Sequence, residues 1–145
     1  MGSDDPAVAR LVALFETMTR ADVARLGVVG AEDASFKDPF HEVRGLAAIE
    51  RVYAHMFDAL DAPRFVVRET VAEGRHCVLV WDFLFAFRRH VRGPQCVRGA
   101  SHLVLGADGR IAMHRDYWDA AEELYAKLPL LGALMRALRR RAAAP

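Results

Sequence analysis

The stretch from Gly109 to Glu123, GRIAMHRDYWDAAEE, places several chemically versatile side chains close together. Alternate residues of an extended strand face the same side, so His114, Asp116 and Trp118 share one side with Ala112. A strand facing only a hydrophobic core would not carry Asp116 there, because an unpaired buried carboxylate costs free energy or has a raised pKa. Asp116 therefore has a partner or lines a cavity, and we take it as the first candidate for a general base.

Asp38, Asp82 and His114 are further candidates for acid–base chemistry. Asp38 precedes Pro39 at the end of a short extended segment, where aspartate is also common as a turn former. Asp82 lies within the apolar stretch CVLVWDFLFAF, so it is either a second carboxylate of the cavity or a partner of Arg98 across a hairpin. A histidine such as His114 assists a carboxylate in some proteins and is a hydrogen-bonded core residue in others.

Other residue patterns indicate neither a metal ion nor another cofactor. His102 and His114 lie in predicted strands, and no pair of histidines has a ligand spacing such as HExxH. The sequence contains no glycine-rich phosphate loop. Cys77 and Cys96 also lie in predicted strands without the spacing of a metal site, and we expect small core residues rather than a disulfide.

The composition predicts one globular domain over residues 1–145. Of the 145 residues, 53% are hydrophobic and 27% are charged, which is typical of a folded chain. A net charge of +1 argues against a nucleic-acid partner, and no apolar run reaches the ~20 residues of a membrane span. The initial MGSDDP is acidic and precedes no apolar segment, so we expect no secretory signal and a cytoplasmic location.

The hydrophobic periodicity predicts an α+β fold. Apolar residues with helical spacing indicate helices over 6–20, from 21 to 28 and from 45 to 60, and a two-residue period then indicates strands. The predicted strands cover 34–37, 65–72, 77–87, 96–105 and 111–118, and helices follow over 120–127 and 130–141. A curved antiparallel sheet with helices in its concave side leaves a cone-shaped hollow, where we expect an apolar pocket.

The order of these elements, with FKDPFHEVRGLAAIERVY and ADGRIAMHRDYWD, resembles the SnoaL-like branch of the NTF2-like superfamily. That superfamily includes ketosteroid isomerase, SnoaL polyketide cyclases and limonene-epoxide hydrolase. The resemblance implies an NTF2-like cone: a curved antiparallel sheet of mixed strand order, wrapped around N-terminal helices and followed by a C-terminal helix. Because this fold carries many activities, the resemblance is specific for the fold rather than for the reaction.

The resemblance also assigns roles to particular residues. Asp38 matches the general base of ketosteroid isomerase, but Leu14 and Ser101 stand where that enzyme has its two oxyanion donors, so we do not expect ketosteroid isomerisation. Asp116 matches the aspartate that activates water in limonene-epoxide hydrolase. The arginine that this hydrolase carries on its long strand is absent from the segment containing Trp81 and Asp82. Asp82 would supply a second carboxylate if it faced inward.

These observations predict a protein that binds a small apolar molecule. Our leading hypothesis is a cofactor-independent enzyme that uses general acid–base chemistry for isomerisation, cyclisation or epoxide opening on a polyketide-, steroid- or terpenoid-like substrate. The alternative is a non-catalytic domain that binds a ligand or acts as a structural dimer. We expect the cavity wall to include Leu14, Tyr53, Phe57, Trp81, Ser101 and Trp118.

Two expectations concern the surface. An open apolar face of the sheet has to be covered, so we expect a homodimer. The C-terminal segment alternates leucines with Arg136, Arg139, Arg140 and Arg141, a pattern found in helices that lie on membrane surfaces. The alternative, which we prefer, is a terminal helix that closes the hollow, with its arginines in solvent near the helix C-terminus.

Overall fold

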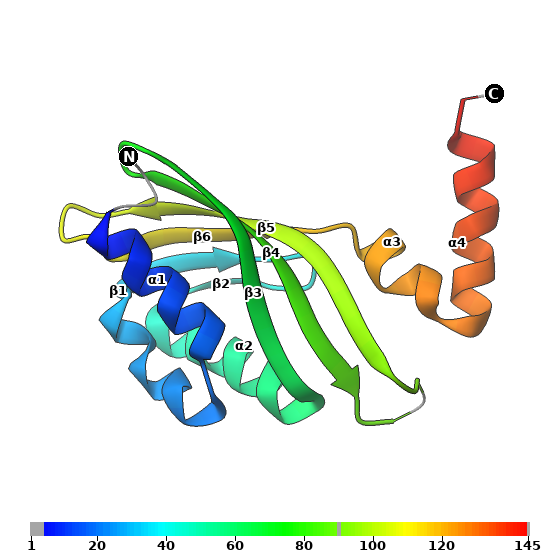
Figure 1. Cartoon of the computed structure of the whole chain (residues 1–145), viewed down its shortest axis with the longest axis horizontal. Coiled ribbons are helices and arrows are strands. Elements are labelled where there is room, and N and C mark those ends of the chain that lie inside the picture. The colour runs from blue at the N-terminus through cyan, green and yellow to red at the C-terminus, as the bar shows by residue number, and fades with distance from the viewer. Residues whose placement is uncertain (1–4, 90, 145) are drawn as a thin grey trace.

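A curved sheet forms the frame of the structure, a computed structural model that describes residues 5–89 and 91–144 (Figure 1). Within these residues the sheet has six strands in the order β2-β1-β6-β5-β4-β3. The strands are β1 (Gly30–Lys37), β2 (Glu42–Arg44), β3 (Leu60–Glu73), β4 (His76–Phe87), β5 (Pro94–Leu105) and β6 (Ile111–Tyr117). Residues 1–4, which begin the segment in which we expect no secretory signal, lie outside the described part of the chain.

The strand pairing agrees with the sequence-based prediction in one part of the sheet and differs from it in another. Strands β3, β4, β5 and β6 form the expected antiparallel meander. Strand β1, however, pairs in parallel with β6, so the sheet is not purely antiparallel. One helix and four strands separate β1 from β6 in the chain, and no hairpin forces them to run in opposite directions. The short strand β2, which pairs with β1, was not predicted.

The helices begin close to the positions that local sequence signals indicate. They are α1 (Pro6–Thr17), the 3₁₀ helix η2 (Arg20–Val28), α2 (Leu46–Ala59), α3 (Ala120–Glu123), the 3₁₀ helix η3 (Tyr125–Lys127) and α4 (Pro129–Ala142). The Asp5 carboxylate caps α1 by accepting a hydrogen bond from the Ala7 backbone N at 2.8 Å. Gly45 precedes α2 with a φ of 95°, which residues with a side chain rarely adopt.

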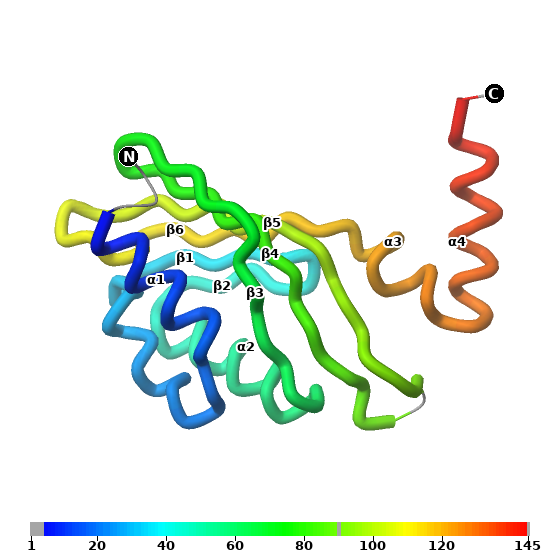
Figure 2. The backbone as a smooth tube through the Cα atoms, viewed as in Figure 1, coloured from blue at the N-terminus to red at the C-terminus, as the bar shows by residue number. Residues whose placement is uncertain are grey.

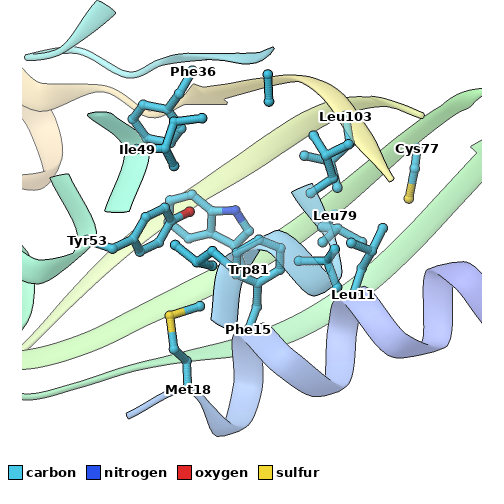
Figure 3. Close-up of a cluster of buried hydrophobic side chains, with 14 of the residues drawn as sticks. Leu11, Phe15, Met18, Phe36, Ile49, Tyr53, Cys77, Leu79, Trp81 and Leu103 are labelled. Carbon is cyan, nitrogen blue, oxygen red and sulfur yellow. The ribbon is translucent and has the colours of Figure 1, made fainter. Parts of the chain in front are cut away.

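Helices α1 and α2 cover the concave side of the sheet (Figures 1 and 2). Leu11 and Phe15 of α1 and Tyr53 of α2 belong to the same buried cluster as Leu79 and Trp81 of β4, as Figure 3 shows. Burial of these apolar side chains is the main favourable term in folding. The predicted α+β cone, with a curved sheet around the N-terminal helices, is confirmed.

Strand β6 contains an irregularity that changes the side to which its first residues point. Its register against β5 skips Ala112, which is therefore an extra residue of the kind found in a β-bulge. As a result, Ile111 and His114 are both buried, whereas Ala112 is exposed. The prediction that Ala112 shares a side with His114 was wrong for this reason. Alternation resumes after the bulge and keeps His114 and Asp116 on the concave side.

Helix α4 projects away from the cone (Figure 1). Leu128 is extended, and Pro129 restarts the helix in a new direction, so that α4 packs against η3. The expectation that the terminal helix closes the hollow was therefore wrong. None of the described helices is both long enough and apolar enough to cross a membrane.

Candidate functional site

A cavity of about 440 Å³ lies between α2 and the concave side of the sheet. Nine of the nineteen residues that line it are aromatic, namely Phe36, Phe40, Tyr53, Phe65, Trp81, Phe83, Phe85, Phe87 and Trp118. Its ionisable groups besides Tyr53 are Asp38, His41, His55 and Asp116, and among the described residues no lysine or arginine lines it. An apolar wall with a few acidic and imidazole groups suits an apolar ligand that carries no negative charge.

Asp116 lines this cavity and is held from behind by two side chains. Its Oδ1 lies 2.7 Å from His114 Nε2 and 2.5 Å from Ser101 Oγ. Ser101 is directly opposite Asp116 in the β5–β6 register, so the pairing of the strands brings these two groups together. Among the described residues, none hydrogen-bonds Asp116 Oδ2. One carboxylate oxygen is therefore fixed, and the other is available to a molecule in the cavity.

The hydrogen bonds around Ser101 have one possible direction. The Trp81 indole N–H only donates, and its Nε1 lies 2.8 Å from Ser101 Oγ. Because Ser101 accepts this bond, its single hydroxyl hydrogen is free to point to the Asp116 carboxylate. An ionised carboxylate only accepts, so the same logic assigns the hydrogen to Nε2 of His114. The chain from Trp81 through Ser101 to Asp116 thus fixes the carboxylate by hydrogen bonds that run in one direction.

The His114 ring is fixed by packing as well as by its hydrogen bond. It is 6% exposed, and its edge-to-face neighbours are Phe36, with ring centroids 4.9 Å apart, and Phe15, at 5.8 Å. Such contacts restrict the rotation of the ring. His114 does not line the 440 Å³ cavity itself, but it helps to define the position of Asp116, which does.

Tyr53 supplies a neutral donor to the same cavity. Burial, and then the negative charges of Asp116 and Asp38, raise the pKa of the Tyr53 hydroxyl well above its ordinary value of 10.0. The hydroxyl therefore stays protonated at neutral pH. Within the described part of the chain, no hydrogen bond joins the Tyr53 hydroxyl to another protein group. It is free to donate to an oxygen atom of a bound molecule.

Asp38 also lines the cavity, and it fixes a turn at the same time. Its Oδ1 accepts hydrogen bonds from the backbone N of Phe40 at 2.8 Å and of His41 at 2.6 Å. The His41 Nδ1 lies 3.0 Å from the same oxygen. Asp38 is therefore a turn former, which was one of the two roles that the sequence allowed for it. The Asp38 carboxylate has contacts to both of its oxygens, whereas Asp116 is bound through Oδ1.

Asp82 does not line the cavity, so the prediction that it supplies a second carboxylate there is wrong. Trp81 and Phe83 point into the concave side, so the residue between them points outward. Asp82 pairs there with Arg68, whose Nε and Nη2 both lie 2.9 Å from Oδ2. Arg98, the other predicted partner, binds Glu123 instead, with 2.7 Å between Nε and Oε1.

Three residues that were predicted in the cavity wall lie outside it. Leu14 and Phe57 pack against the core, and Ser101 lines a small recess behind Asp116. On α1 the next residue, Phe15, faces the recess behind Asp116. On α2 the wall is formed by the turn containing Tyr53 and Met56. The helical periodicity identified the buried side of each helix, but not which of its residues border the open space.

His102, the other histidine of a predicted strand, lies away from the cavity. His102 lies on the outer side of the sheet, where its Nε2 is 2.8 Å from Nδ1 of His76. In residues 5–89 and 91–144, no three potential ligands are grouped closely enough to hold a metal ion.

Several wall residues were not predicted as part of the site. Phe83 and Phe85 alternate with outward residues of β4, but the apolar residues on both sides of this strand concealed the alternation. Phe40 and His41 follow the Asp38 turn, and no spacing in the sequence indicates that this loop reaches the cavity. Phe40 packs against Trp118 with ring centroids 5.5 Å apart.

Solved structures share this architecture. A hypothetical protein with a ketosteroid isomerase-like fold from Catenulispora acidiphila DSM 44928, in complex with trimethylamine, is similar with a TM-score of 0.72 and 17% identity over 86% of this chain and 94% of that one. A putative SnoaL-like polyketide cyclase from Jannaschia sp. CCS1 has a TM-score of 0.67 and 17% identity over 96% and 93% of the two chains. An LEH-like epoxide hydrolase from M. tuberculosis has a TM-score of 0.65 and 16% identity over 91% and 92%.

At these identities the solved structures establish the fold and not the reaction. No curated protein matches the sequence. The family model described as the SnoaL-like domain matches residues 11–114, which include the second half of α1, the helices η2 and α2, Tyr53 and His114. Since that match covers more than half of the chain, this protein belongs to the SnoaL-like domain family.

Proposed function

We propose that this protein binds a small apolar molecule in the 440 Å³ cavity and catalyses a cofactor-independent proton transfer on it. One observation carries the proposal. Asp116 presents a free Oδ2 to an aromatic cavity, while Ser101 and His114 fix its Oδ1. A positioned carboxylate in apolar surroundings is a common general base. The pairing with His114 does not remove Asp116 from reach, because Asp116 still lines the cavity.

The reaction that suits these groups best is proton abstraction from a carbon next to a carbonyl. Asp116 Oδ2 takes the proton, and the electrons of the C–H bond move to the carbonyl oxygen and form an enolate. The Tyr53 hydroxyl donates a hydrogen bond to that oxygen. Return of the proton from Asp116 to another carbon gives an isomer. Attack of the enolate carbon on a second carbonyl instead gives an alkoxide, which takes the proton back from Asp116 and yields a cyclised product.

Epoxide opening is the second candidate reaction. A recess of about 10 Å³ lies behind Asp116 and is lined in part by Tyr53, Ser101 and His114. This volume is near the smallest that holds one water molecule, and the lining offers the polar partners that a water needs. Asp116 would then take a proton from that water as its oxygen attacks the epoxide carbon, and Tyr53 would protonate the oxygen released by the ring.

A panel of substrates tests the proposal and separates it from a non-catalytic role. Apolar ketones, polyketide-like polyketones and terpenoid epoxides are offered to the wild type and to Asp116→Asn, with binding and turnover measured separately. Turnover that is lost in Asp116→Asn while binding is retained supports the enzyme. A compound that binds both proteins tightly without turnover in either favours the alternative, a ligand-binding domain. Asp82→Asn is the matched control, since its carboxylate lies outside the cavity.

We also propose a homodimer formed through the outer side of the sheet. Val71 is 60% exposed there, and Tyr117 is 51% exposed. Val78 and Val80 lie between them in the sheet and are half-buried. Exposed apolar side chains on an outer sheet face, here beside His102 and Arg115, are typical of a surface that a second copy covers.

The cytoplasm remains the compartment that we propose. Cys77 is buried and Cys96 is half-buried, and both are free thiols. Free thiols are usual in reducing compartments.

A further inference from the structure

Helix α4 is fixed at an angle to the rest of the chain rather than trailing from it. Gly132 lies so close to η3 that a Cβ there would collide with the carbonyl oxygen of Ala126. Arg136 Nη1 donates to the same oxygen at 3.2 Å. Gly132 and Arg136 are one helical turn apart, so a single side of α4 contacts η3. These contacts determine which side of the helix is left uncovered.

The uncovered side of α4 carries a leucine stripe, formed by Leu130, Leu134 and Leu138. The three are spaced four residues apart and therefore lie along one side of the helix. They are 89%, 52% and 50% exposed, respectively. At 100° per residue, Gly132 and Arg136 lie on the side of the helix opposite to the leucine stripe. Leu130 and Leu134 thus face away from the protein's own core, and no element in the described part of the chain covers them, whereas Leu138 borders a groove that α4 forms with α3 and η3.

The charge of α4 indicates the kind of surface that the leucine stripe meets. The helix contains Arg136, Arg139, Arg140 and Arg141 and no acidic residue. The chain as a whole is nearly balanced, with 20 basic and 19 acidic residues, so the positive charge is concentrated in this segment. Exposed leucines beside arginines that can extend to the headgroups are typical of helices that lie in the interface of an anionic membrane.

We propose that α4 docks the protein on an anionic lipid surface. Leu130, Leu134 and the exposed part of Leu138 enter the boundary between headgroups and acyl chains, and the positive charge of Arg139, Arg140 and Arg141 attracts the lipid phosphates and carboxylates. A short helix with three leucines binds reversibly, so the protein exchanges between the membrane and solution. The cone with its cavity stays outside the lipid, because α4 projects from it (Figure 1). This proposal is independent of the proposed reaction.

Sedimentation of the full-length protein with vesicles tests the proposal. The vesicles are phosphatidylcholine alone and phosphatidylcholine mixed with phosphatidylserine, each at low and at physiological salt. We expect the wild type to sediment with the mixed vesicles and less at the higher salt. In Leu130→Ser/Leu134→Ser the partition coefficient falls at least tenfold. In Arg139→Gln/Arg140→Gln/Arg141→Gln it falls about 100-fold, since each basic residue near the surface contributes about 1 kcal/mol.

Matched controls keep the test specific to α4. Val28→Ser removes an apolar side chain that is 56% exposed in η2, and Arg10→Gln/Arg51→Gln/Arg75→Gln removes three exposed arginines elsewhere. Both controls should sediment like the wild type, and circular dichroism verifies that every variant is folded. Absence of wild-type sedimentation at low salt overturns the proposal, as does equal binding to both vesicle types. If the leucine variant instead converts a dimer to a monomer in the ultracentrifuge without vesicle binding, the stripe covers a second copy and the lipid proposal is wrong.

Discussion

The hydroxyl of Ser101 and the carboxylate of Asp116 face each other across β5 and β6, with 2.5 Å between Oγ and Oδ1. The indole N–H of Trp81 donates to the same hydroxyl from the next strand, β4. Three neighbouring strands thus each contribute one member of a hydrogen-bonded row beneath the cavity. The row positions the carboxylate by the pairing of the sheet itself, which is more rigid than a loop.

Ser101→Ala should destabilise the fold, because it leaves the buried Trp81 N–H without an acceptor. We expect a loss of about 1–3 kcal/mol in the free energy of unfolding, measured by urea denaturation. Ser35→Ala, which changes a partly buried serine of β1 outside the cavity, is the matched control and should change stability much less. Equal effects in the two variants would show that the hydrogen bond from Trp81 contributes no stability.

Asp116→Asn should separate chemistry from stability. Asparagine keeps an oxygen that accepts from Ser101 and His114, so the free energy of unfolding should fall by only about 1 kcal/mol. The rate of proton transfer, measured with a substrate from the panel, should fall about 100-fold or more. Asp82→Asn should leave this rate unchanged. A loss of stability above about 2 kcal/mol with an unchanged rate would instead identify Asp116 as part of a structural ion pair.

Tyr53→Phe should change the behaviour at high pH. The raised pKa of Tyr53 means that the folded state holds this proton more tightly than the unfolded state, whose tyrosine has the ordinary value of 10.0. The stabilisation that this tighter proton binding gives to the folded state is therefore complete below pH 10. It is lost as the pH rises toward the pKa of the folded state, by up to about 1.4 kcal/mol per pH unit.

Alkaline unfolding curves give the measurement for this residue. Tyr53→Phe should remove part of the loss of stability above pH 10, whereas Tyr117→Phe, at a tyrosine 51% exposed, should keep the wild-type slope. The ring of Tyr53 packs against Phe15 and Phe36, contacts that phenylalanine retains, so stability at neutral pH should change little. If the free energy of unfolding fell equally steeply with pH in all three proteins, the Tyr53 hydroxyl would not have a raised pKa.

Val80→Lys should dissociate the proposed homodimer. The side chain lies on the outer side of β4, with Glu69 of β3 opposite it, so a lysine there finds an acidic neighbour within its own sheet and the monomer should fold. Sedimentation velocity at micromolar concentration should show a dimer for the wild type and a monomer for this variant. Val28→Lys, in η2 and outside the sheet, should remain dimeric. A wild-type monomer at this concentration would refute the dimer.

The sequence alone was sufficient to predict the helices and strands, and to place His114 and Asp116 together in the site. Hydrophobic periodicity and caps are local signals, so the meander β3 to β6 and the helix after Gly45 were predicted, with ends off by a few residues. Alternation along a strand is also local, and for that reason His114 and Asp116 were correctly placed on one side of β6. The bulge at Ala112 was not predicted, because it depends on the register against β5.

The tertiary structure decided everything that depends on contacts between distant segments. Asp82 follows Trp81 in a strand that is apolar on both sides, so only the packing of β4 against the helices determines that Trp81 points inward and Asp82 outward. The partners of Asp116 depend on strand register, which sets Ser101 opposite it. The direction of α4 depends on the close contact of Gly132 with Ala126, and amphipathicity gives a helix an apolar side without fixing what that side meets.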